Sequence, residues 1–132
     1  MVKWMRTGYL ISVWLFLLGV LAQTFLAGLA LFSLSAYWKD HTSLGWLVAH
    51  GLPILPLLFA LFSRLPRDAW GMLIILLILA GIQPFLPGLR RELPWAAALH
   101  PVNALLLFWI GLKVARRARD FVAPPLGTGS AV

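Results

Sequence analysis

The chain has 132 residues, of which 61% are hydrophobic and 11% are charged, whereas a soluble domain carries about 45–50% apolar and about 25% charged residues. A membrane-spanning helix needs about 20 apolar residues, so four spans with short connections nearly fill this length and exclude a separate soluble catalytic domain. Cysteine is absent, which excludes disulfides, thiolate metal sites, iron–sulfur clusters and covalently attached c-type haem. We therefore predict an integral membrane protein and do not expect an enzyme that acts by itself.

Four apolar runs predict four transmembrane helices. The first run is roughly twice as long as the apolar region of a signal peptide, about 7–15 residues, so we expect it to be a retained span. Residues 1–121 are predicted to form one all-α domain, a polytopic membrane four-helix bundle, and residues 122–132 a disordered C-terminal tail without apolar periodicity. The predicted spans are 9–32, 43–62, 70–86 and 95–114, and the predicted connections are 33–42, 63–68 and 87–94.

The net charge of +7 resides mostly at the ends of the apolar runs, so it indicates membrane topology and not nucleic-acid binding. If the spans alternate in direction, one side of the membrane holds most of the basic residues and the other holds only Lys39, Arg90 and Arg91. Because basic residues are enriched on the cytoplasmic side, both termini are predicted to be cytoplasmic, in a bacterial inner membrane. The basic residues of the richer side are Lys3, Arg6, Arg64, Arg67, Lys113, Arg116, Arg117 and Arg119.

A short internal repeat divides the chain into two halves. The segment Gln23-Thr-Phe-Leu-Ala-Gly28 recurs, at four of six positions, as Gln83-Pro-Phe-Leu-Pro-Gly88. In each half the glutamine is followed by a turn, a histidine (His41 or His100) and an apolar helix. The repeat predicts two tandem helical hairpins of the same orientation, with both histidines at the outer mouth of the bundle.

Polar side chains at membrane depth are costly and tend to face a bundle interior or a functional site. His41 and Gly45 share one helix face, whereas His50 is nine residues from His41 and lies on the opposite face. We therefore expect His41 and His100, but not His50, to share one planar partner, with their imidazoles within about 10 Å of each other. Small residues beside them leave space for a flat macrocycle, and bundle cores build cofactor sites from facing helices.

One histidine on helix 2 and one on helix 4 at equal depth would satisfy a bis-histidine haem, with His41 and His100 as the metal ligands. Arg90, Arg91 or Lys39 would be near enough to pair with the haem propionates.

The same residues allow other interpretations. His41 and His100 could simply begin helices at the wet interface, since proline favours the first helical turn and follows His100 directly. Gln23 and Gln83 could form interhelical hydrogen bonds, and the small residues could pack against partner helices. This alternative is a cofactor-free structural membrane subunit. A third possibility is a quinone or lipid site formed by Gln23, Gln83 and His50.

Missing motifs exclude several classes of enzyme and transporter. The sequence has no Ser/His/Asp set, no H-E-x-x-H word and no phosphate-binding loop. Its acidic residues lie at span boundaries or in the tail, whereas proton pumps and ion-coupled transporters usually carry a carboxylate inside the membrane. Hydrolysis and ion-coupled transport are therefore disfavoured.

Gln23-x-Phe-Leu-x-Gly28, His41-x-x-Leu-Gly45 and Leu99-His100-Pro-Val-Asn-Ala104 resemble a bacterial family of small four-helix membrane proteins of unknown function. More distantly, the chain resembles one half of haem A synthase and other four-helix b-type cytochromes. This resemblance implies haem ligands at His41 and His100, although Thr42 stands where haem A synthase has an arginine. We thus expect electron transfer, or an accessory role in a larger respiratory or photosynthetic membrane complex or a homo-oligomer. The lipid bilayer is an expected partner in each case.

Overall fold

The computed structural model describes residues 1–122, and their regular structure is entirely helical, as predicted. Residues 123–132, nearly all of the predicted tail, lie outside the described residues. The elements in chain order are α1 (Val2–Phe32), α2 (Tyr37–Trp46), the π-helical η1 (Leu47–Gly51), α3 (Ile54–Ser63), α4 (Arg67–Ile82), the 3-10 helix η2 (Leu86–Arg90), α5 (Pro94–Ala97) and α6 (Leu99–Val122).

The first hairpin consists of α1 and a return segment, Tyr37–Ser63, that is built from α2, η1 and α3. The return segment changes its hydrogen-bond pattern in the middle because Pro53 has no backbone N–H to continue the α-helical ladder. The N–H of Leu52 instead donates to the carbonyl of Leu47, five residues back, at 2.8 Å. The helix thus passes through one π-helical turn just before Pro53.

The second hairpin consists of α4 and α6, joined by η2 and α5. Helix α4 ends at Ile82 because Pro84 removes a donor and restricts Gln83 before it. It therefore covers residues 67–82. The helix begins and ends earlier than the predicted span 70–86 and is slightly shorter. Helix α2 also begins earlier than predicted, at Tyr37, so His41 lies inside a helix and not at its start.

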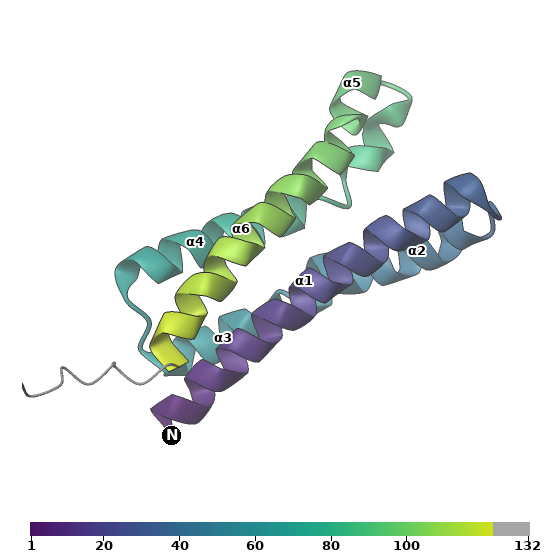
Figure 1. The fold of residues 1–132 in the computed structure, drawn as a ribbon. Helices are drawn as coiled ribbons and strands as arrows, with labels where there is room; N and C mark the ends of the chain where they lie inside the picture. Colours follow the sequence, from purple (N-terminus) through teal and green to yellow (C-terminus); the bar gives the residue numbers. More distant parts are fainter. Residues whose placement is uncertain (123–132) are drawn as a thin grey trace, which may run out of the picture.

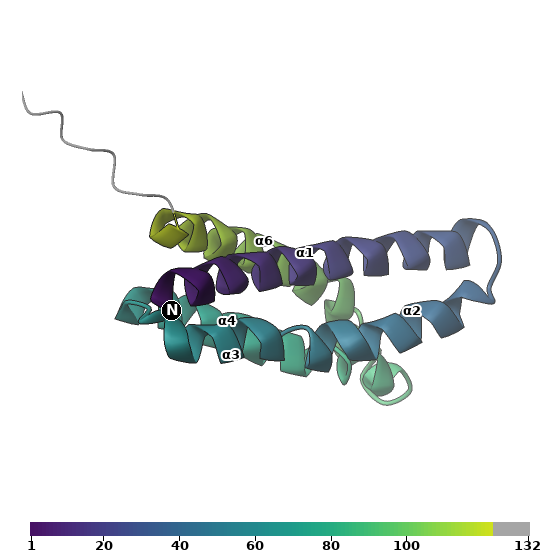
Figure 2. The ribbon, with the colours of Figure 1, turned by 90° about the horizontal axis from the view of Figure 1, so that it is seen from below.

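Figures 1 and 2 show the two hairpins packed together at the end that carries the N-terminus. There α1 packs against α3 and α6, while α4 packs against α6 and η1. Arg6 links three helices at this end, since its Nε donates to the Ser63 carbonyl at 3.1 Å and its Nη1 to the Phe121 carbonyl at 3.4 Å. Toward α2 and α5 the two hairpins diverge into separate arms (Figure 1).

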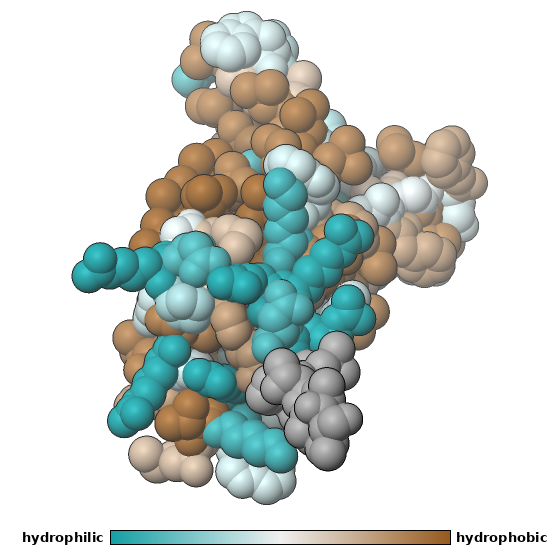
Figure 3. Space-filling view, turned by 60° about the vertical axis from the view of Figure 1, so that its left-hand side comes forward, coloured by the Kyte–Doolittle hydropathy of each residue, from teal (hydrophilic) through white to brown (hydrophobic). Residues whose placement is uncertain are grey.

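The outer surface of the bundle is apolar, and its core is small. Large exposed hydrophobic side chains include Trp14, Leu18, Phe25 and Ile78, as expected where lipid replaces water as the solvent. Figure 3 shows the apolar surface of both arms and the hydrophilic side chains gathered at the opposite end. The fully buried core side chains include Tyr9, Val13, Phe16, Leu17, Leu73, Leu76 and Val114.

Three segments are long and apolar enough to cross a membrane: Val2–Phe32, Tyr37–Ser63 and Pro94–Val122. Helix α4 has 16 residues, and at about 1.5 Å per residue it is about 24 Å long, shorter than a hydrocarbon core of about 30 Å. These are the properties of a helical membrane protein.

Candidate functional site

The imidazole of His41 is held by a backbone group of the preceding helix. His41 lies in α2, and its Nδ1 is 3.0 Å from the carbonyl oxygen of Gln23 in α1. A carbonyl oxygen can only accept a hydrogen bond, so Nδ1 carries the proton and donates it. In the neutral ring, Nε2 then keeps its lone pair and is free to act as an acceptor or as a metal ligand.

The second hairpin repeats this arrangement. His100, in the first turn of α6, places its Nδ1 3.0 Å from the carbonyl oxygen of Gln83, just beyond the end of α4. The histidine follows its glutamine by 18 residues in the first hairpin and by 17 in the second. The repeat in the sequence thus corresponds to the same hydrogen bond in both hairpins, and both rings take the tautomer with a free Nε2.

The two anchored imidazoles lie next to each other between the hairpins. Their ring centroids are 6.3 Å apart and their planes are inclined by 71°. The prediction that these rings lie within about 10 Å of each other is confirmed by this distance. Trp38, one turn before His41, meets that ring edge-on at a centroid distance of 5.5 Å, so it encloses one side of the pair.

The side-chain amide of Gln83 is fully engaged. Its Nε2 donates to the His100 carbonyl at 3.1 Å, and its Oε1 accepts from Asn103 Nδ2 at 2.6 Å. Asn103 Nδ2 also donates to the Leu79 carbonyl at 2.9 Å. This network ties the end of α4 to the start of α6. Sequence reasoning assigned no role to Asn103, although it belongs to the same Leu-His-Pro-Val-Asn word as His100.

The side-chain amide of Gln23 lacks this network. Its Oε1 lies 3.4 Å from the position that a Cβ at Gly45 would occupy, and its Nε2 is buried without a hydrogen-bond partner among the described residues. The asymmetry has a simple origin, because the residue of the first hairpin that corresponds to Asn103 is Leu44, which has no polar atoms. A buried amide donor without an acceptor is unusual in proteins and indicates that a partner is missing.

His50 lies apart from these residues. Its side chain is exposed on the π-helical turn, its Nδ1 contacts the Trp46 carbonyl at 3.2 Å, and its ring stacks on Trp46 at a centroid distance of 4.7 Å. The structure therefore does not bring His50 together with Gln23 and Gln83. Arg90, at the end of η2, and Arg91 directly after it are exposed, as is Lys39 on α2.

Comparison with known proteins places the chain in a family. The model of a family of unknown function, DUF6220, matches residues 23–91. The chain belongs to this family. The DUF6220 match includes Gln23, His41 and Gln83 but ends before His100. Neither the curated proteins nor the solved structures give a match, so these comparisons do not show the resemblance to haem A synthase.

The number of potential metal ligands in this DUF6220 chain limits the chemistry of the site. Within residues 1–122, no three His, Cys, Asp or Glu side chains come together as a metal cluster. The histidine pair therefore offers two nitrogen ligands, which is too few for a typical structural or catalytic zinc site with three or four protein ligands. Two imidazoles do suffice for a metal whose other ligands come from its own macrocycle, as in haem.

Proposed function

We propose that the protein binds one haem b between its two hairpins through His41 and His100 and acts as a small b-type cytochrome. Its role would be electron transfer, alone or as an accessory subunit of a larger respiratory or photosynthetic membrane complex. The observation that carries the proposal is the histidine pair, in which each ring is fixed by its Nδ1–H and the two rings, from different hairpins, lie next to each other.

The spacing of the pair supports this ligand set. The centroid of an imidazole whose Nε2 binds a metal ion at about 2.0–2.1 Å lies about 3.2 Å from the metal, so two such rings have centroids at most roughly 6.5 Å apart. The centroids of His41 and His100 are 6.3 Å apart. Two imidazoles that hold one metal ion through Nε2 would be free to twist about their bonds to it, so the inclination of 71° between His41 and His100 is compatible with such a pair.

The hydrogen bonds around the pair also support the proposal. Metal-binding histidines generally donate their other N–H to a carbonyl or carboxylate, which fixes the ring orientation and raises the basicity of the ligating nitrogen. Both histidines make this bond to a backbone carbonyl. Because the acceptors belong to the main chain, they do not depend on the side chains of Gln23 and Gln83. The unpartnered Nε2 of Gln23 is a donor for an acceptor of the bound group.

The bound haem would supply one-electron chemistry, while the chain supplies orientation and electrostatics. His41 and His100 are the proposed iron ligands. Lys39 precedes His41 on α2, and Arg90 and Arg91 lie in the connection before α6. All three are exposed, and they are the proposed charge partners of the propionates. Exclusion of water by the apolar arms would favour a low-dielectric site, which tunes the reduction potential.

The proposed setting is a bacterial inner membrane, with four spans and both termini cytoplasmic. Contacts of Arg6 with the ends of α3 and α6, and of Arg117 with Asp68 at 2.8 Å, bring the basic segments to one end of the bundle. An end rich in arginine and lysine favours the cytoplasmic side.

A reduced-minus-oxidised difference spectrum of the purified protein tests haem binding. Wild type should show the sharp α-band of a b-type haem, and His41→Ala and His100→Ala should each lose it. His50→Ala is the matched control and should keep the band, because His50 faces the exposed surface. If wild type purified from its native membrane shows no Soret absorbance, the cytochrome proposal fails and the cofactor-free structural subunit takes its place.

A further inference from the structure

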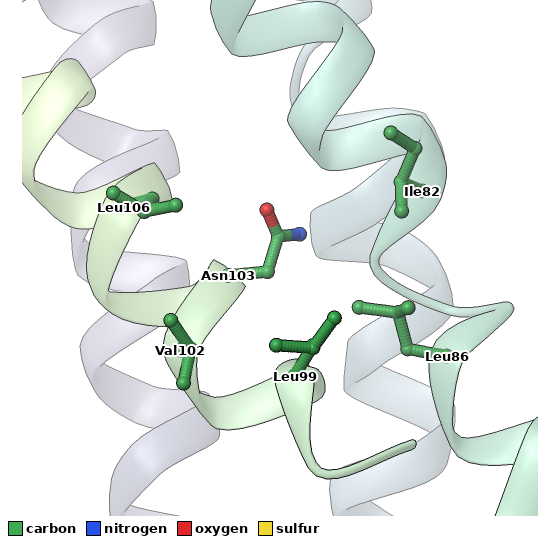
Figure 4. Close-up of a pocket in the computed structure, with 6 residues that line it drawn as sticks. All are labelled: Ile82, Leu86, Leu99, Val102, Asn103 and Leu106. Carbon is green, nitrogen blue, oxygen red and sulfur yellow. The ribbon is translucent and has the colours of Figure 1, made fainter. Parts of the chain in front are cut away.

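A second feature of the fold is an apolar pocket on the outside of the second hairpin. Its volume is about 170 Å³, close to that of a cavity of about 150 Å³ that holds one benzene molecule. Figure 4 shows its walls, which come from the end of α4, the start of η2 and the first two turns of α6. The lining residues are Ile82, Leu86, Leu99, Val102, Asn103 and Leu106.

The pocket opens on an exposed apolar surface, which would face lipid in a membrane. Four of its six lining side chains are exposed on the bundle surface: Ile82, Leu99, Val102 and Leu106. A ligand would therefore enter from the bilayer and must itself be apolar for most of its length. The volume of the pocket accommodates about one six-membered ring, which limits the part of the ligand that can enter.

Among the described residues, Asn103 is the only polar one in the lining, and it is 6% exposed. Its amide orientation is fixed, because Nδ2 donates to the Leu79 carbonyl and to Gln83 Oε1. These two bonds use both protons of Nδ2, and they leave Oδ1 as the free atom. Among residues 1–122, no hydrogen bond reaches Oδ1. The pocket thus presents one hydrogen-bond acceptor and no free donor to a ligand.

We infer that this pocket binds the ring of a membrane quinol. A quinol combines a single six-membered ring, a hydroxyl donor that matches Asn103 Oδ1 and an apolar tail that extends into lipid. The oxidised quinone has only carbonyl acceptors at its ring, so it would leave Oδ1 unpaired in an apolar site, which is unfavourable. The site therefore selects the reduced form. This binding uses different side chains from the histidine pair and does not depend on haem.

Binding can be measured by calorimetry on the full chain in phosphatidylcholine nanodiscs, under anaerobic conditions. The probes are a decyl-tailed benzoquinol, its quinone and decylbenzene, which has a ring and a tail but no oxygen. The quinol should bind at least about tenfold tighter than either of the other two, as expected for one additional hydrogen bond in an apolar site.

Variants separate the acceptor from the shape of the pocket. Asn103→Leu should abolish the preference for the quinol, but it also breaks the bonds to Leu79 and Gln83 and could unfold the hairpin. Val102→Phe avoids this difficulty, because it fills the pocket from an exposed position and leaves the amide network intact. It should abolish binding of all three probes. Leu105→Phe is the matched control on the same helix, at a position 72% exposed and outside the pocket, and should bind as wild type does.

Equal affinity for the quinol and decylbenzene would overturn the inference and show an unspecific apolar crevice. Absence of saturable quinol binding, or unchanged binding in Val102→Phe, would overturn it as well. His41→Ala distinguishes this inference from the proposed function, since it removes a proposed iron ligand on the other hairpin. Quinol binding by that variant should match wild type whether or not wild type carries haem.

Discussion

The unequal networks of Gln23 and Gln83 make these two residues a matched pair for stability measurements. Both are glutamines at corresponding positions of the repeat, and both accept a histidine Nδ1–H through the backbone. Replacing either with leucine keeps the backbone bond and changes only the side-chain amide. In the haem-free protein, the two substitutions should have different effects on the free energy of unfolding.

For Gln83→Leu the expected loss is about 1–3 kcal/mol, because two hydrogen bonds worth about 0.5–1.5 kcal/mol each are broken. Those bonds join the amide to His100 and Asn103. Gln23→Leu removes a buried donor that has no partner. Since an unsatisfied buried donor costs about 1–3 kcal/mol, this substitution should leave the stability unchanged or raise it by about 1–2 kcal/mol.

Unfolding by sodium dodecyl sulfate in mixed micelles, followed by circular dichroism, compares both variants with wild type. From the values above, the free energies of unfolding of the two variants should differ by about 1–5 kcal/mol. Equal destabilisation by both substitutions would refute the reasoning, because it would mean that the Gln23 amide already has a partner in the haem-free protein.

Three further predictions follow from the structure. Haem at a hundredfold excess over its dissociation constant should stabilise wild type by about 2.7 kcal/mol in thermal unfolding. His41→Ala and His100→Ala should each abolish this gain, and the double variant should show no further loss. A haem-dependent gain in either single variant would contradict a shared iron. Gly111→Ala should lower the stability by about 1–3 kcal/mol, because the new Cβ would lie 2.7 Å from Leu17 Cδ2. The Cβ of Gly71→Ala would meet no atom within 4 Å, so this control should be neutral or stabilising in the same thermal assay. Equal losses of stability in the two variants would contradict the packing described. A reporter active only in the cytoplasm, fused after Val132, should be active in cells, and activity only from an outward-reporting fusion would reverse the topology.

The pairing of the two histidines could be predicted from the sequence because two kinds of information agreed. The repeat gave corresponding positions to His41 and His100, and helical periodicity placed His50 on the face opposite His41. The structure has the first two rings adjacent and His50 on the exposed surface. Their role as iron ligands stays a prediction.

Helix boundaries were predicted less well, because hydropathy reports burial in lipid and not backbone hydrogen bonding. Residues Tyr37–Thr42 are too polar to count as part of a span, yet they continue the helix beyond the apolar run. At α4 the apolar run extends past Ile82, but Pro84 ends the helix earlier.

The asymmetry between the two glutamines was not predicted from the sequence. It depends on how α4 and α6 are rotated against each other, since only that rotation brings Asn103 onto the Gln83 amide. The repeat predicts equivalent surroundings for Gln23 and Gln83, and the substitution of Leu44 for Asn103 at the corresponding position is the only signal of a difference.

The most direct test of the shared iron is electron paramagnetic resonance of the oxidised protein purified from its native membrane. Coordination by both His41 and His100 predicts a low-spin ferric haem signal typical of two imidazole ligands, converted to high spin in the His41→Ala and His100→Ala variants that retain any haem. A high-spin signal in wild type, or a low-spin signal that persists in both variants, would contradict coordination by this pair.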